Sequence, residues 1–156
     1  MSEEKKPAGA REAARDSSQG AGENEVERRI VIEFGTGARL EASALFAPDE
    51  GHSFIASDSV PKGERTFRLP KSRNLAARGD PVAVSETAFV LAEVPGVRVD
   101  GKTRQHSDAW ILNMLPAGRR PKGGCDVLVG RDIMVGQRWR IDLVGGGGLE
   151  ARPIVW

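Results

Sequence analysis

The stretch of sequence that decides the fold is Gly123-Gly124-Cys125-Asp126-Val127-Leu128-Val129-Gly130-Arg131-Asp132-Ile133-Met134. Its apolar run Val127-Leu128-Val129 is too short for a helix and rich in β-branched residues, so it predicts a buried strand. Gly130 ends that strand, and the four residues after it can begin a short helical turn. The sequence therefore predicts a buried strand that leads through a glycine into one turn of helix.

The composition limits the classes of protein to which the chain can belong. Its 156 residues favour one domain, and the 23 basic and 22 acidic side chains give a net charge of +1. That balance gives no reason to expect nucleic acid or a membrane surface as a partner. The 19 glycines and 9 prolines indicate an all-β domain with many turns.

Targeting signals are also lacking in the printed sequence. No apolar run approaches the roughly 20 residues that a membrane helix needs, and the first residues contain no apolar signal core. The single Cys125 has no second cysteine with which to form an internal disulfide. We therefore expect an intracellular, cytoplasmic protein.

The first 27 residues differ from the rest of the chain. Met1 and Val26 are the only large apolar residues before Ile30, so this segment cannot bury enough surface to offset the entropy of ordering its backbone. We predict a disordered tail over residues 1–27 and one folded domain over residues 28–156.

A β-hairpin is predicted at the start of the folded domain. Residues 28–34 form one strand, Gly35-Thr36-Gly37 supplies a turn, and residues 39–46 return as a second strand. In the return strand apolar side chains recur at every second position, which is the period of a strand with one buried face.

The chain then reads Ala44-Leu45-Phe46-Ala47-Pro48-Asp49-Glu50-Gly51-His52-Ser53-Phe54-Ile55. Together with Gly130-Arg131-Asp132 after a buried strand, this segment resembles the retropepsin-like aspartic proteases of retroviruses and LTR retrotransposons. In retrotransposon proteases the corresponding segment reads Ala-Leu-Ile-Asp-Thr-Gly-Ala-Thr-His-Ser-Phe-Ile. The resemblance implies a closed antiparallel β-barrel with one short helix near the C-terminus. It also implies a homodimer in which each subunit supplies one catalytic Asp to a polypeptide substrate.

The centre of the motif departs from the family pattern. In an ungapped alignment Ala47 occupies the place of the catalytic Asp, whereas a shifted alignment makes Asp49-Glu50-Gly51 a variant of Asp-x-Gly. An aspartic protease needs two carboxylates that share one proton, so Ala47 cannot act and Asp49 is the candidate catalytic residue. The resemblance assigns support of this loop to Gly51, Gly130, Arg131 and Asp132, with the arginine pairing with a carboxylate near the loop.

The family also implies a flap and a dimer contact. By position, part of Val82–Gly101 would form the flap hairpin that covers a peptide, with turns at Pro95-Gly96 and Asp100-Gly101. The terminal strands of these proteases interleave in the dimer, and the apolar end Ile154–Trp156 suits that role.

Two functions therefore remain open. The first is an aspartic endopeptidase that acts on polypeptides as a homodimer, with Asp49 from each subunit. The second is a catalytically inactive retropepsin-like domain that serves as a dimerisation or peptide-binding module. An unrelated small β-barrel that acts as an interaction module is a third reading of the same strands.

No metal ion or cofactor is expected. His52 and His106 are the only histidines, and neither has cysteine or acidic residues at ligand spacing. Cys125 has no histidine placed to activate it and is expected to be a small buried side chain. The glycines of residues 145–148 lack the Lys-Ser/Thr and the helix of a phosphate loop, so they predict a turn.

Overall fold

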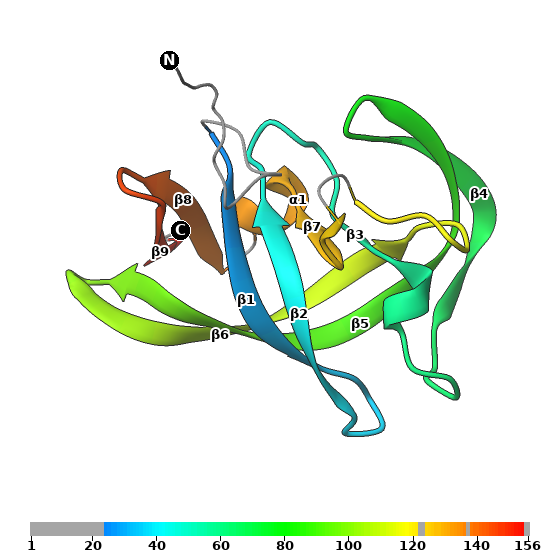
Figure 1. Ribbon diagram of the computed structural model, residues 1–156, viewed down its shortest axis with the longest axis horizontal. Helices are drawn as coiled ribbons and strands as arrows, with labels where there is room; N and C mark the ends of the chain where they lie inside the picture. Colours follow the sequence, from blue (N-terminus) through cyan, green and yellow to red (C-terminus); the bar gives the residue numbers. More distant parts are fainter. Residues whose placement is uncertain (1–23, 122–123, 137, 155–156) are drawn as a thin grey trace, which may run out of the picture.

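The computed structural model describes residues 24–121, 124–136 and 138–154 of the chain, and nine strands in this part form a single sheet (Figure 1). The strands are β1 (Val26–Glu33), β2 (Arg39–Phe46), β3 (Phe54–Ile55), β4 (Phe67–Ala77), β5 (Asp80–Val99), β6 (Lys102–Met114), β7 (Val127–Val129), β8 (Trp139–Val144) and β9 (Gly148–Pro153). A short helix, α1 (Arg131–Met134), follows β7, and a 3₁₀ turn, η1 (Ser57–Ser59), follows β3.

Six of these strands close into a barrel. Their order is β1-β2-β7-β3-β6-β5, and β5 pairs back with β1 through Val31 and Glu93. The prediction of an all-β barrel with one short helix is therefore confirmed. The predicted antiparallel pairing is wrong for two pairs of neighbours, because β2 pairs with β7 and β3 pairs with β6 in parallel. Strand β7 reaches its place between β2 and β3 through a long connection, which parallel neighbours require.

The long strand β5 connects the barrel to the rest of the sheet. Strand β6 lies along one edge of β5, and β4, β1 and β9 lie in turn along the other edge. At Pro95-Gly96 the β5–β6 register shifts, and the Arg28 guanidinium donates hydrogen bonds to the carbonyls of both residues. The predicted turn at Pro95-Gly96 is thus a bulge in a continuous strand, because proline interrupts the ladder without reversing the chain.

Two apolar clusters lie on opposite sides of the strands β2, β7 and β3. Val127 and Val129 belong to the main cluster inside the barrel. In this cluster the rings of Phe46 and Trp110 pack edge to face, with their centroids 6.1 Å apart. Leu128 belongs to a second cluster beneath the β4–β5 hairpin. Strand β7 is therefore buried on both faces, which explains its uninterrupted apolar run.

The boundary of the folded part lies slightly earlier than the predicted one. Strand β1 begins at Val26, two residues before the predicted start of the domain at Arg28. The rest of the predicted tail, residues 1–23, lies outside the described residues.

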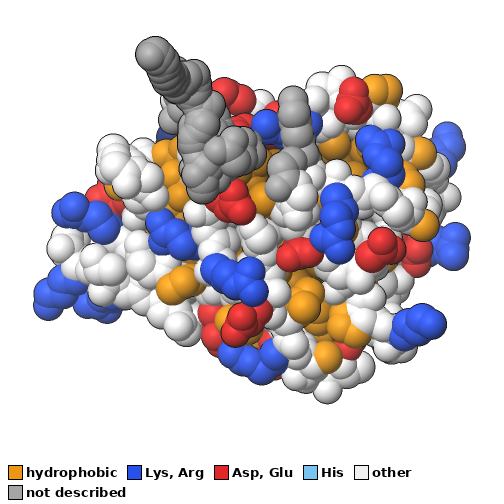
Figure 2. All heavy atoms as spheres, in the orientation of Figure 1, with side chains coloured by type: hydrophobic (Ala, Val, Ile, Leu, Met, Phe, Trp, Pro, Cys, Tyr) orange, Lys and Arg blue, Asp and Glu red, His pale blue; other side chains and the backbone are white. Residues whose placement is uncertain are grey.

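Among the residues that are described, no helix has the length and apolar character to cross a membrane. Figure 2 shows basic and acidic side chains mixed over the visible face of the molecule.

Candidate functional site

Two connections emerge side by side at one edge of the sheet. Strands β2 and β7 are parallel neighbours, with Phe46 paired to Val129. The loop Ala47–Gly51 follows β2, and the turn Gly130–Asp132 follows β7. Because parallel neighbours end at the same edge, the two motifs that carry the family resemblance meet in space although they are far apart in sequence.

Backbone hydrogen bonds join the loop to the turn. The Ala47 N–H donates to the Val129 carbonyl at 2.9 Å, and the Arg131 N–H donates to the Glu50 carbonyl at 2.8 Å. The loop is also closed on itself, since the Glu50 N–H donates to the Ala47 carbonyl at 3.0 Å. These bonds fix the backbone of the loop against β7 and the start of α1.

Gly130 is required at its position by space. A Cβ atom there would lie 2.5 Å from the His52 carbonyl oxygen and 2.7 Å from the Glu50 carbonyl oxygen. Its φ of −104° is open to any residue, so the close approach of the loop backbone, and not the conformation, excludes a side chain. The Gly130 N–H donates a 2.7 Å hydrogen bond to Ser53 Oγ. The predicted supporting role of Gly130 thus has a direct geometric basis.

Asp132 braces the segment that follows the loop. Its Oδ2 accepts the Ser53 N–H at 3.0 Å, and its Oδ1 accepts the Ser53 hydroxyl at 2.5 Å. Ser53 is completely buried. A carboxylate that accepts two hydrogen bonds from one buried residue holds that residue firmly.

Arg131 contributes through its backbone. Its side chain is exposed, and within the described ranges its guanidinium makes no hydrogen bond or ion pair. The carboxylate-bearing side chain of this turn that contacts the loop region is Asp132. The resemblance had given the Arg131 side chain a carboxylate partner near the loop, and no such pair is present among the described residues.

The candidate catalytic residue lies at the tip of the loop. Asp49 is exposed, and no described residue forms a hydrogen bond or ion pair with its carboxylate. Ala47, at the position of the catalytic Asp in the ungapped alignment, is completely buried in the second apolar cluster. A Cβ atom at Gly51 would meet nothing within 4 Å, so no close contact requires a glycine there.

The second acid of the loop is already engaged. Glu50 Oε1 accepts the Arg78 N–H at 2.9 Å. Arg78 and Gly79 form the two-residue turn between β4 and β5, with φ of 55° and 86°. This contact ties the tip of the β4–β5 hairpin to the loop. The hairpin tip that reaches the candidate site is therefore Arg78-Gly79, just outside the predicted flap region.

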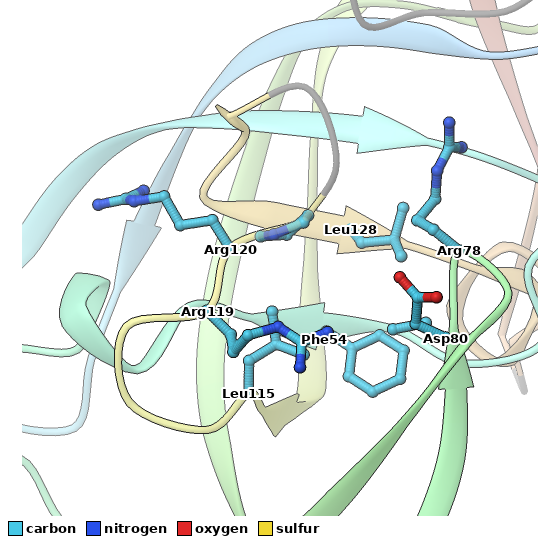
Figure 3. A pocket seen from close by; sticks show the side chains of 9 residues that line it. Phe54, Arg78, Asp80, Leu115, Arg119, Arg120 and Leu128 are labelled. Atoms are coloured by element: carbon cyan, nitrogen blue, oxygen red, sulfur yellow. The ribbon is translucent and has the colours of Figure 1, made fainter.

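A depression of about 430 Å³ lies between this hairpin tip and the connection from β6 to β7 (Figure 3). It is lined by Phe54, Ala77, Arg78, Asp80, Leu115, Arg119, Arg120, Pro121 and Leu128. Neither Asp49 nor Glu50 lines it. The sequence gives no local signal for this depression, because the depression depends on the approach of the β4–β5 hairpin to the connection after β6.

Asp126 fixes the other end of β7. Burial alone would raise the pKa of its carboxyl group, but hydrogen bonds from the Ser43 N–H, the Arg120 guanidinium and the Ser59 hydroxyl outweigh burial and lower the pKa. The two acids Asp126 and Asp132 thus fasten both ends of β7 to the neighbouring strands.

The two histidines lie in different surroundings. His52 lines a groove of about 750 Å³ beside β6 and α1, together with Asp132 and Arg138. His106 is buried against Trp139, with ring centroids 4.6 Å apart, and burial lowers its pKa. In the part of the chain that the structure describes, no three His, Cys, Asp or Glu side chains come together as metal ligands.

No model of a known protein family matches the sequence, and no curated protein is significantly similar to it.

Proposed function

We propose that this chain is a catalytically inactive retropepsin-like domain that binds an extended polypeptide in the depression between the β4–β5 hairpin and the loop after β6. The observation that carries the proposal is the position of the acids. Asp49 lies at an exposed loop tip and does not line the depression, and Ala47 is buried at the place of the catalytic Asp.

Hydrolysis by an aspartic peptidase needs two carboxylates that share a proton and face the bond to be cleaved. Glu50 is not free for that task, because its carboxylate accepts the Arg78 N–H. Among the described residues, Asp80 is the one acid that lines the depression, and it belongs to the β4–β5 hairpin and not to the loop. The arrangement therefore favours binding without cleavage.

Peptide binding is supported by the edge of the hairpin. In the described residues β4 pairs with β5 alone, so the opposite edge of β4 has no strand partner. An unpaired edge can accept an extended peptide as an added strand, whose backbone supplies affinity while neighbouring pockets select side chains. The depression opens beside the tip of the same hairpin.

A homodimeric aspartic peptidase is the second candidate. The intact brace from Gly130 and Asp132, together with the exposure of Asp49, favours it, because a second copy could bring another Asp49 to the same place.

The predicted dimer contact through the terminal strand would have few free backbone groups to use. Strand β9 is paired with β8 on one edge and with β5 on the other, and the Ile154 N–H donates to the Arg138 carbonyl. Residues 155 and 156 lie outside the described ranges.

The test is to pass a library of short synthetic peptides over the immobilised chain and identify those retained by mass. The proposal expects peptides retained at full length, with slower amide hydrogen exchange at Arg78 and in residues 115–121 when they are bound. An Asp49→Asn variant should retain the same peptides. Retention of none, or recovery of fragments that disappear with Asp49→Asn, would contradict the proposal.

A further inference from the structure

Three arginine side chains line the depression, and they differ in whether they are paired with an acid. Arg78, Arg119 and Arg120 line it. Two of the three have partners: Arg120 forms a 2.7 Å ion pair with Asp126, and Arg78 pairs with Glu25. The Arg119 guanidinium makes no hydrogen bond or ion pair with any described residue, and only the backbone N–H of Arg119 is engaged, with the Pro116 carbonyl. One guanidinium is therefore available to a ligand.

The side chains differ in direction as well as in pairing. Figure 3 shows Arg119 extending towards Phe54, whereas Arg120 and Arg78 point away from that ring. The available guanidinium is thus the one directed into the depression.

In the part of the chain that the structure describes, one carboxylate faces the depression from the opposite wall. Asp80 lies at the start of β5, and Figure 3 shows its carboxylate between Arg78 and Phe54. No described residue pairs with the Asp80 carboxylate, and it does not form an ion pair with Arg119. The hairpin wall therefore presents a negative charge and the loop wall a positive charge.

The floor between the two charges is apolar. Phe54 and Leu128 have no exposed surface, and Leu115 is 3% exposed. Charges above a closed apolar floor are less screened than charges on an open surface, so each attracts a ligand charge more strongly. Complementary charges of this kind give selectivity more than affinity.

We infer that this depression selects an extended peptide segment that carries one acidic and one basic side chain. The acidic side chain is bound by Arg119 and the basic side chain by Asp80. The inference rests on the proposed function and adds to it the charge pattern of the ligand.

The test uses four synthetic peptides of equal length with the same apolar positions. One carries a Glu and a Lys, two carry either Glu or Lys with Gln at the other position, and one carries Gln at both. Binding is measured by fluorescence anisotropy at low salt. Each matching charge should tighten binding by about three- to fivefold, the upper range for an exposed ion pair, so the Glu–Lys peptide should bind most tightly.

Matched variants assign each charge to its residue. Arg119→Gln should abolish the preference for Glu over Gln and leave the preference for Lys. Asp80→Asn should do the reverse. Arg120→Gln is the control on the same loop and should leave both preferences unchanged, because its guanidinium is already paired with Asp126.

The outcomes separate the inference from the proposed function. Equal binding of all four peptides would overturn the charge selectivity while leaving peptide binding intact. Preferences that persist in both Arg119→Gln and Asp80→Asn would also overturn the inference, because the charges would then be read elsewhere. Failure of all four peptides, and of every peptide in the library, would overturn the proposed function itself.

Discussion

The loop Ala47–Gly51 and the turn Gly130–Asp132 lie in contact, yet their residues are packed and hydrogen-bonded to different extents. The turn contains Gly130, where a larger residue would clash with backbone carbonyl oxygens, and Asp132, whose carboxylate holds buried Ser53. The loop has a buried alanine, Ala47, and an exposed acid, Asp49, at its tip. The turn is held by close and buried contacts, whereas the tip of the loop is exposed. We therefore expect the fold to depend more on the turn than on the loop.

We expect the largest difference in stability between substitutions of Gly130 in the turn and Gly51 in the loop. Gly130→Ala should lower the free energy of unfolding by about 3 kcal/mol, because its new Cβ would overlap the His52 and Glu50 carbonyl oxygens. Gly51→Ala is the matched change in the loop and should alter stability by less than about 0.5 kcal/mol, since nothing lies near its Cβ. Urea denaturation of both variants checks the pair. Equal effects would show that the close approach at Gly130 is not required.

We expect the next largest difference in stability between substitutions of Asp132 in the turn and Asp49 in the loop. Asp132→Ala should cost about 2 kcal/mol, because it leaves the buried Ser53 N–H and hydroxyl without their acceptor. Asp49→Ala should change stability by less than about 0.5 kcal/mol, because its carboxylate is exposed. Thermal unfolding of the two variants beside the parent protein measures the difference. A larger loss for Asp49→Ala would reverse the roles assigned to loop and turn.

The contact between the loop and the hairpin tip should have a smaller effect. Glu50→Ala removes the acceptor of the Arg78 N–H and should cost about 1 kcal/mol. The amide hydrogen of Arg78 should then exchange faster, while that of Ser53 keeps its protection. Unchanged exchange at Arg78 would mean that the hairpin tip is held without Glu50.

The pH dependence of stability tests the role of Asp126, which lies at the start of β7. The pKa of Asp126 is below its ordinary value of 3.8, so the ionised carboxylate stabilises the folded chain above about pH 4. That contribution is lost as the pH falls through the folded-state pKa. Asp126→Asn should therefore lower stability by up to about 1 kcal/mol at neutral pH and flatten its decline below pH 4. Denaturation profiles from pH 2 to pH 7 that fall equally in both proteins would contradict this.

Much of the fold could be predicted from local patterns. The hairpin of β1 and β2 follows from alternating apolar residues around Gly35-Thr36-Gly37, and α1 follows from the sequence after Gly130. The length of β4 and the continuity of β5 past Pro95-Gly96 were missed, because each is set by pairing along the whole length of a neighbouring strand, and β5 also pairs with the distant strands β1 and β9. Parallel pairing of β2 with β7 likewise depends on a long connection that carries no local signal.

The candidate site was predictable to a smaller extent. The loop and the turn were both found, and their contact follows from the resemblance. That Asp132 braces Ser53 while Arg131 acts through its backbone depends on side-chain directions that a linear sequence does not encode. Arg119 and Asp80 were missed because they come together only when the β4–β5 hairpin folds towards the loop after β6.

The most direct test of the account is peptide cleavage by the purified chain. A diverse peptide mixture is incubated with it from mildly acidic to neutral pH, beside the Asp49→Asn variant, and products are identified by mass. The account predicts no cleavage above that of the variant, from a protein shown to be folded. Cleavage by the parent chain that disappears in Asp49→Asn would contradict it and establish an aspartic peptidase.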